Sequence, residues 1–155
     1  MAPVAEADKV VLARLLELYR YDMSDFRPYV LSPHGTYEYR YLDVYFLNDD
    51  REACFIKVDS ELAGFTMTRM LRNNTRCVAE FFVVKRWRRR GVGTAVAAGL
   101  LARHPGRWEV AVDDANTAGQ AFWPAVCETA ARGAVETRRK SDDAYYPGIE
   151  LLFES

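Results

Sequence analysis

The spacing of apolar residues changes along the chain from a helical period to a strand period. In the first part, apolar side chains recur at i, i+3, i+4 and i+7, which predicts an amphipathic helix over residues 6–20. The residues that set this period are Leu12, Leu15, Leu16 and Tyr19. After a polar and aromatic connection, a second apolar group predicts a short helix that begins near residue 41 and ends near residues 48–50.

From residue 53 onward the apolar runs are short and end at turn-forming residues. Residues 53–58, 62–70 and 77–84 each predict a strand, and the turns between them are short. Short turns join neighbouring strands in antiparallel order, so these segments predict a meander. The last run is almost continuously apolar, which predicts burial on both of its faces.

The second half of the sequence alternates between helix and strand signals. A helical stripe begins at Val92 and stops at Pro105-Gly106, and residues 108–112 predict a strand. A strand–helix–strand connection requires a crossover, so this strand should run parallel to the strand before the helix. A further helix is expected over residues 117–131, followed by closing strands near residues 134–139 and 149–153. The predicted architecture is α+β: a mixed, mostly antiparallel sheet with helices on both faces.

Length and charge narrow the classes of protein to consider. The chain has 155 residues and a formal net charge of -1, which fits one domain over residues 1–155 with its own core. A near-neutral chain of this kind is neither disordered nor broadly basic, so we expect no nucleic-acid partner. Charged residues run through the N-terminal apolar positions, so we expect neither a signal peptide nor a membrane partner.

Cysteine and histidine usage predicts no metal site. The three cysteines, Cys54, Cys77 and Cys127, lie in apolar contexts without CxxC spacing, and an odd number disfavours a disulfide framework. Buried, reduced thiols in a cytoplasmic protein are the simplest interpretation. His34 and His104 lie in separate loops beside proline and form no ligand set.

The most informative segment is a cationic, glycine-containing turn between an apolar strand and a helix. Residues 83–94 read VVKRWRRRGVGT. Glycines let the backbone turn sharply, free amides at a helix start attract anions, and arginines add charge-assisted hydrogen bonds to phosphate. The alternative for the same residues is a solvated cationic turn, or a nuclear-localisation or RNA-binding patch.

Two common phosphate-binding motifs do not fit this turn. The P-loop pattern GxxxxGK followed by Ser or Thr is absent. The dinucleotide fingerprint is met at Gly91 and Gly93, and Asp113 lies where a ribose-binding acid could stand, but the third small position is Val96. The antiparallel strands before the turn also disfavour that interpretation.

A third pattern, R/Q-x-x-G-x-G/A after an apolar strand, is satisfied by Arg88 to Gly93. It resembles the coenzyme A loop of the GNAT superfamily of N-acetyltransferases. A second family motif, close to N-x-x-A-x-x-F/L-Y, resembles the segment from Asn116 to Trp123, and the order of elements is similar over nearly the whole chain. The family's opening strand would fall at residues 1–4. The stretches YRYDMSDF, AEFFV and AFW look like a subgroup of predicted GNAT acetyltransferases.

The resemblance implies acetyl-CoA as acyl donor and a parallel strand pair splayed around it. Backbone groups of the strand would pair with the pantetheine arm, amides at the helix start would hold the pyrophosphate, and some arginines would face phosphates or solvent. Asn116 would serve both as a helix cap and as a contact to pantetheine. The implied cofactor-binding residues are Phe82, Val83, Val84, Arg88, Arg89, Arg90, Gly91, Val92, Gly93, Thr94, Asn116, Phe122 and Trp123.

The resemblance also implies direct transfer of the acetyl group to an amine. The amide nearest Val83 would polarise the thioester carbonyl. Glu80 is the lone acid in an apolar run and is the first candidate for the base; the alternatives are a structural ion pair or a side chain that faces solvent at the strand start. Trp123 stands where the family often has a tyrosine, and an indole N–H is no practical acid, so water, Tyr145 or Tyr146 would protonate the thiolate. A buried, inert Cys127 is preferred to an acyl-cysteine route.

The acceptor side is expected on the first two helices, their connection and the final loop. Acids and tyrosines there suit a cationic amine, so a small amine is the first candidate and protein amines are the next. The acids and tyrosines concerned are Tyr21, Asp22, Asp25, Tyr37, Glu38, Tyr39, Tyr41, Asp43 and Tyr45. The rival function is a degenerate GNAT domain that binds acyl-CoA as a sensor or scaffold. Many relatives dimerise, so a homodimer is also an expectation from the resemblance.

Overall fold

The computed structural model describes residues 1–140 and 146–155, and these fall into two compact units. Unit 1 comprises residues 1–68 and 80–88, and unit 2 comprises residues 69–79 and 89–155. The prediction that residues 1–155 form one domain stays a prediction, and each unit is described by itself.

Unit 1 contains the first helix and the first strands of the sheet. Its strands follow the order β1-β2-β3-β4, and β1 pairs antiparallel with β2 by placing Ala2 opposite Phe55. The opening strand is thus present, although it is short. The elements that begin in unit 1 are β1 (Ala2–Pro3), the 3-10 turn η1 (Glu6–Asp8), α1 (Lys9–Met23), α2 (Val44–Leu47), β2 (Arg51–Val58), β3 (Glu61–Met70) and the 3-10 turn η3 (Lys85–Trp87).

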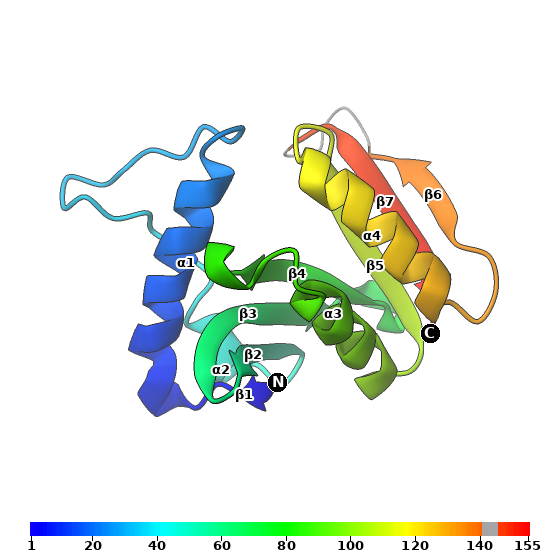
Figure 1. Ribbon diagram of the computed structural model, residues 1–155, viewed down its shortest axis with the longest axis horizontal. Helices are drawn as coiled ribbons and strands as arrows, with labels where there is room; N and C mark the ends of the chain where they lie inside the picture. The colour runs from blue at the N-terminus through cyan, green and yellow to red at the C-terminus, as the bar shows by residue number, and fades with distance from the viewer. Residues whose placement is uncertain (141–145) are drawn as a thin grey trace. The chain divides into compact units, whose positions relative to one another are not determined.

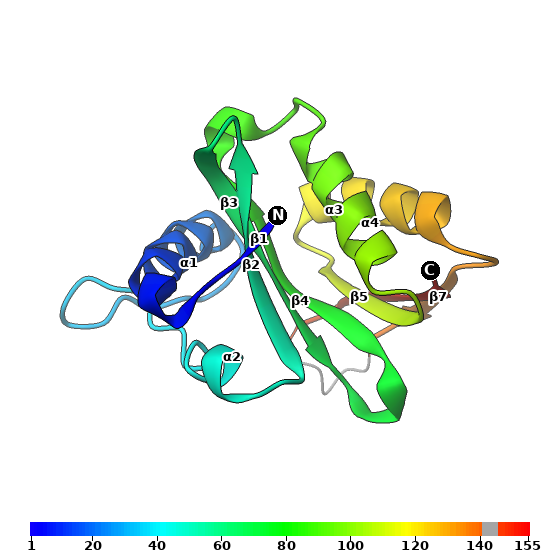
Figure 2. The same cartoon turned by 90° about the horizontal axis from the view of Figure 1, so that it is seen from below.

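The apolar stripe of α1 forms the core of unit 1, as its spacing predicts. Leu12, Leu15 and Leu16 are buried. One turn further along, the ring of Tyr19 contacts Phe65 of β3 and Phe82 of β4 edge-on, each with centroids 5.9 Å apart. Figure 2 shows α1 lying alongside these strands. The contact brings the C-terminal half of α1 next to the end of β4, where the candidate site lies.

Unit 2 contains the rest of the sheet and the last two helices. Its strand order is β4-β5-β7-β6. β4 pairs parallel with β5 through Arg76 and Trp108, and β5 pairs antiparallel with β7. Helix α4 lies over β5 and β7 (Figure 1). The elements are the 3-10 turn η2 (Arg72–Asn74), β4 (Arg76–Val83, which continues into unit 1), α3 (Val92–Arg103), β5 (Arg107–Asp113), α4 (Thr117–Ala130), β6 (Glu136–Arg139) and β7 (Gly148–Glu154).

The predicted fold class is confirmed. Within residues 1–140 and 146–155, the strands form a seven-stranded, mostly antiparallel sheet in which β4 and β5 are the parallel pair, flanked by helices. The parallel pair follows from the crossover through α3, as the strand–helix–strand pattern predicts. Helix α2 is shorter than its apolar residues predict, since residues 41–43 form a turn.

β4 is less buried than its apolar run predicts. Cys77, Phe82 and Val83 are buried, whereas residues 78–81 are only half-buried. These half-buried residues lie where the strand passes from unit 2 into unit 1. A continuous apolar run therefore overestimates the burial of these residues.

The helices within residues 1–140 and 146–155 are too short or too polar to span a membrane. None of them combines the length and apolar character needed to cross a bilayer.

Candidate active site

The glycine turn has the backbone geometry of an anion-binding helix start. Gly91 is the N-cap of α3 and adopts a left-handed conformation, with φ 76° and ψ -8°. Arg89 is also left-handed, with φ 60°. The amide of Ala95 makes the first bond of the helix, to the Gly91 carbonyl at 3.0 Å. The amides of the helical residues before Ala95 have no hydrogen-bond acceptor within the helix, so they can donate to an anion bound at this end.

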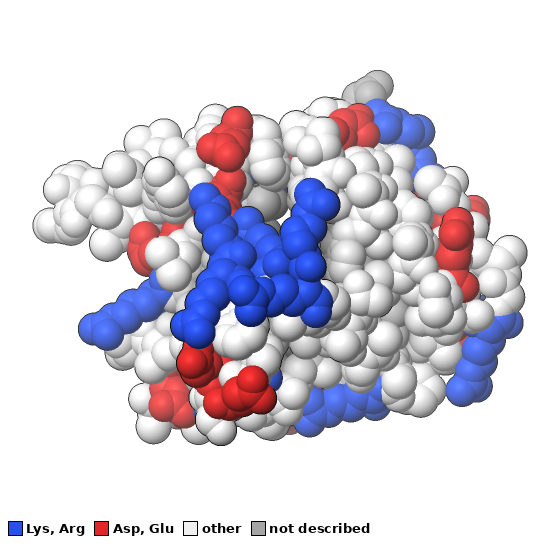
Figure 3. All heavy atoms as spheres, in the orientation of Figure 1, with Lys and Arg blue, Asp and Glu red and all other residues white. Residues whose placement is uncertain are grey.

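Cationic side chains gather over the segment that joins β4 to α3 (Figure 3). In unit 1 these side chains already bind acids. Asp22 near the end of α1 binds both Arg88 and Lys85, the latter at 3.3 Å, and Arg86 binds Glu61 at 3.0 Å. The prediction that not every arginine of the turn is available to a phosphate agrees with these pairs.

Arg88 also holds the end of β4. Its Nε donates to the carbonyl oxygen of Val83 at 2.6 Å. The Val84 amide donates to the carbonyl of Ala63 at 2.9 Å. Two of the backbone groups expected to pair with pantetheine therefore have partners within unit 1. A pantetheine arm would use the remaining groups of Phe82 to Val84 or displace Arg88.

Glu80 lies in a cluster of hydroxyl and cationic groups in unit 1. The Tyr39 hydroxyl donates to its Oε1 at 2.9 Å, and the Tyr19 hydroxyl is a second hydrogen-bond partner. Burial raises the pKa of the Glu80 carboxyl above its usual value, while the two hydroxyls, Arg20 and Arg27 act in the opposite direction. A buried carboxyl with a raised pKa is the kind of group that serves as a general base.

Asn116 caps α4 as the sequence predicts. Its Oδ1 accepts from the Gly119 amide at 2.9 Å. A Cβ on Gly119 would lie 2.7 Å from Asn116 Nδ2, so only glycine leaves room for the cap in this geometry. The cap accounts for Asn116 by itself, and its contact with pantetheine stays a prediction.

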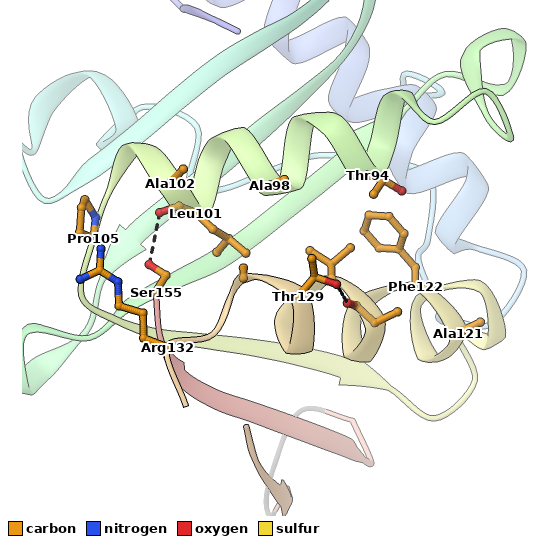
Figure 4. A pocket seen from close by; sticks show the side chains of 13 residues that line it. Thr94, Ala98, Leu101, Ala102, Pro105, Ala121, Phe122, Thr129, Arg132 and Ser155 are labelled. Atoms are coloured by element: carbon orange, nitrogen blue, oxygen red, sulfur yellow. Dashed lines mark hydrogen bonds between the residues drawn. The ribbon is translucent and has the colours of Figure 1, made fainter. Parts of the chain in front are cut away.

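An apolar cavity of about 600 Å³ lies between α3 and α4 within unit 2. Two of the predicted cofactor residues, Thr94 and Phe122, line it near the beginnings of the two helices (Figure 4). Trp123 is buried, 8 % exposed, with its ring centroid 5.0 Å from that of Phe122. Phe122 thus faces the cavity, whereas Trp123 is part of the core.

The structure describes only one of the two tyrosines proposed as acids. Tyr145 lies outside the described residues. Tyr146 is described, and the Lys140 ammonium lies 3.2 Å from its ring centroid. The role of either residue as an acid stays a prediction.

Cys127 is a poor nucleophile. All three cysteines are buried and free of disulfides. Burial raises the pKa of the Cys127 thiol to about 12, and Glu128 adds to the effect. The thiolate is the reactive form, so this environment favours the inert role over an acyl-cysteine route.

Several residues expected to attract a cationic amine already contact the chain's own cations. Asp43 binds Lys9, and Asp22 binds the loop cations described above. Arg20 lies 5.2 Å from the Tyr39 ring centroid, and Arg51 lies 5.4 Å from that of Tyr45. The mixture of acids and aromatics in the sequence is therefore a weaker sign of a cationic acceptor than its composition indicates.

Three residues near the candidate site are not predicted from the sequence to belong to it. Tyr19 fits the apolar stripe of α1, and Arg20 follows it as an ordinary helical cation. Gly64 of β3 has φ 154°, and a Cβ there would lie 1.9 Å from the Phe82 carbonyl oxygen. A glycine inside a strand pattern was the available signal for this close approach.

Comparison with known proteins identifies the family. A family model described as acetyltransferase (GNAT) family matches residues 15–127, so the chain belongs to the GNAT acetyltransferase family. A comparison with curated protein sequences gives no significant match.

Solved structures show the same fold at low sequence identity. An acetyltransferase from Thermus thermophilus is 16% identical with a TM-score of 0.70, over 99% of this chain and 95% of that chain. Aminoglycoside acetyltransferase AAC(6')-Ib in complex with coenzyme A and kanamycin is 13% identical with a TM-score of 0.68, over 98% and 92%. A Bacillus subtilis acetyltransferase in complex with CoA is 12% identical with a TM-score of 0.56, over 74% and 82%.

Proposed function

We propose that this protein is an acetyl-CoA-dependent N-acetyltransferase that moves the acetyl group directly to a small amine. The observation that carries the proposal is the left-handed Gly91 at the start of α3, in a chain of the GNAT acetyltransferase family. Two of the solved structures compared above are complexes with coenzyme A, and one of them also contains kanamycin.

The proposed donor contacts are those that the resemblance to the family implies. In unit 2, amides from Arg89 to Thr94 would bind the pyrophosphate, with Asn116 and Phe122 nearer the pantetheine. In unit 1, backbone groups of Phe82, Val83 and Val84 would bind the pantetheine arm. The cations of the turn add long-range attraction for the phosphates.

Glu80 is the proposed base. The amine must lose a proton to attack, and a carboxylate of raised pKa accepts a proton more readily at neutral pH than an ordinary one. In the transfer, a C–N bond forms at the acetyl carbon, the C–S bond breaks, and the amine's proton passes to Glu80 directly or through water. The departing thiolate takes a proton from water or from a tyrosine, because the indole of Trp123 is no practical acid. No metal takes part in this scheme.

The test is a thermal shift with acetyl-CoA followed by release of free thiol with a panel of amines. The proposal predicts stabilisation by acetyl-CoA and amine-dependent thiol release. Stabilisation without release for any amine would favour the sensor or scaffold role. The absence of stabilisation at saturating acetyl-CoA would contradict both functions.

The role of Glu80 is tested with a matched pair of variants. Glu80→Gln should lower turnover while acetyl-CoA affinity stays nearly unchanged. Glu109→Gln removes a half-buried acid of raised pKa from β5 and should leave turnover near that of the wild type. Equal turnover of Glu80→Gln and the wild type would remove Glu80 as the base.

A further inference from the structure

The Glu80 carboxyl is held by hydroxyls from two separate segments of unit 1. Tyr19 lies on α1, and Tyr39 lies on the connection between α1 and α2. Both hydroxyls are hydrogen-bond partners of the carboxyl, that of Tyr39 at 2.9 Å. All three residues are half-buried. Two donors from separate segments therefore hold the carboxyl in one orientation.

Tyr39 is held in turn by a guanidinium group. Arg20 lies 5.2 Å from the Tyr39 ring centroid and 4.5 Å from that of Tyr29, so one cation contacts both rings. Tyr39 comes from a long connection without regular structure, and such a residue needs an anchor to keep its hydroxyl on one acceptor. The contact with Arg20, which belongs to α1, supplies it.

We propose that Tyr39 is a positioning residue for the catalytic carboxylate: with Tyr19 it fixes Glu80 in the orientation that receives the acceptor's proton, and Arg20 fixes Tyr39. This inference rests on the proposed function, because it assigns Glu80 the role of base. It assigns Tyr39 no proton transfer of its own.

The surroundings of Tyr39 explain why it positions the base and does not act as the acid. Burial and the negative charge of Glu80 raise the pKa of Tyr39 far above its usual value. A phenol in this position keeps its proton and donates a hydrogen bond throughout the working pH range. Tyr19 is in the same situation for the same reasons.

The groups that face Glu80 have opposing effects on its protonation. Burial favours the neutral acid, whereas Tyr19 and Arg20 from α1, and Arg27 and Tyr39 from the connection, favour the carboxylate. Tyr29 contacts the same cluster through Arg20, and Tyr45 raises the pKa of Tyr39 electrostatically. Removing one hydroxyl donor should therefore raise the pKa of Glu80 further.

The direct test is a carbon-13 NMR titration of the glutamate carboxyl carbons in the full chain, with Glu80→Gln to assign the signal. Tyr39→Phe keeps the ring and removes the donor, so the Glu80 titration should move to higher pH by about one unit, a tenfold change in the proton equilibrium. Tyr19→Phe should move it in the same direction. Tyr41→Phe is the matched control, since its hydroxyl contacts Arg40 and not Glu80. An unmoved Glu80 titration in Tyr39→Phe would overturn the proposal.

A second measurement separates this inference from the proposed function. With an amine that supports turnover, the acid limb of the kcat/KM profile should move to higher pH in Tyr39→Phe by the shift seen in NMR, at unchanged acetyl-CoA affinity. A shifted NMR titration with an unmoved limb would overturn the positioning role. Full turnover of the Glu80→Gln variant would instead show that Glu80 is not the base and would contradict that part of the proposed function.

Discussion

The Nε of Arg88 donates to the carbonyl oxygen of Val83 at 2.6 Å, and the same guanidinium binds Asp22 of α1. Arg88 therefore connects the end of α1 with the end of β4 inside unit 1. Asp22 also binds Lys85, so one carboxylate offsets two of the loop's positive charges. We therefore expect this pairing to make the loop less attractive to phosphate than its sequence implies.

Replacing Asp22 tests this effect. Asp22→Asn removes the negative charge, so acetyl-CoA should bind roughly threefold more tightly at low salt, a long-range charge effect of about 0.7 kcal/mol. Calorimetric titration at two salt concentrations measures it. Asp43→Asn is the control, because Asp43 binds Lys9 on another part of the unit. Equal or weaker binding by Asp22→Asn would show that the acid does not compete with the phosphates.

Gly64 should be indispensable for folding. Its missing Cβ would lie 1.9 Å from the Phe82 carbonyl oxygen, and its φ is 154°. Gly64→Ala should lower the free energy of unfolding by at least about 3 kcal/mol, because backbone must move to make room. Gly133→Ala meets no atom within 4 Å and should change stability little. Urea unfolding of both variants makes the comparison, and similar stabilities would contradict the close approach of β3 and β4.

Removal of the Asn116 cap should lower the stability of the folded chain less than Gly64→Ala does. Asn116→Ala should cost about 1 kcal/mol of stability, because the Gly119 amide loses its acceptor. Asn116→Asp keeps an acceptor at the same place and should retain most of that stability. Urea unfolding of the wild type, Asn116→Ala and Asn116→Asp measures the effect. Equal midpoints for the three proteins would rule out a stabilising cap.

Glu80 should make stability depend on pH in a specific direction. Its pKa is raised in the folded chain, so above the ordinary glutamate value the unfolded chain loses a proton that the folded chain keeps. The contribution of Glu80 to the free energy of unfolding is therefore most favourable at low pH, and it is lost as pH rises through the folded-state pKa. Glu80→Gln should therefore gain stability relative to wild type as pH rises. Thermal unfolding over a pH series measures the difference, and a constant difference would contradict the raised pKa.

Cys127 should not react in the folded protein. A thiol of pKa about 12 has almost no thiolate near neutral pH, so an alkylating reagent should label it only after unfolding. Cys127→Ser should keep turnover. Rapid labelling of native Cys127, or an acetyl-cysteine trapped by mass spectrometry, would restore the acyl-enzyme route.

The sequence predicts the helices and strands well because their apolar periods are strong. The stripe of Leu12, Leu15 and Leu16 locates α1, and the Arg88–Gly93 pattern locates the start of α3 with Gly91 at its cap. Local signals of this kind need no knowledge of distant partners.

Most of the surroundings of Glu80 could not be predicted in the same way. Tyr39 is distant from Glu80 in sequence, and no local pattern links them. Tyr19 fits an apolar stripe equally well with or without a hydroxyl partner. Arg88 looks like one more cation of the turn, yet its partners Val83 and Asp22 are set by tertiary packing. Composition therefore suggests chemistry here, but only the folded chain assigns each side chain its partner.

The central claim is that the Gly91 turn binds acetyl-CoA, and calorimetric titration of Gly91→Glu tests it most directly. Both Gly91 and Gly35 are left-handed with no atom within 4 Å of an added Cβ, so Gly35→Glu is a matched control. We predict that the wild type and Gly35→Glu bind acetyl-CoA, and that Gly91→Glu, folded by circular dichroism, does not, because the new carboxylate blocks and repels the pyrophosphate. Binding of acetyl-CoA by Gly91→Glu with wild-type affinity would contradict the claim.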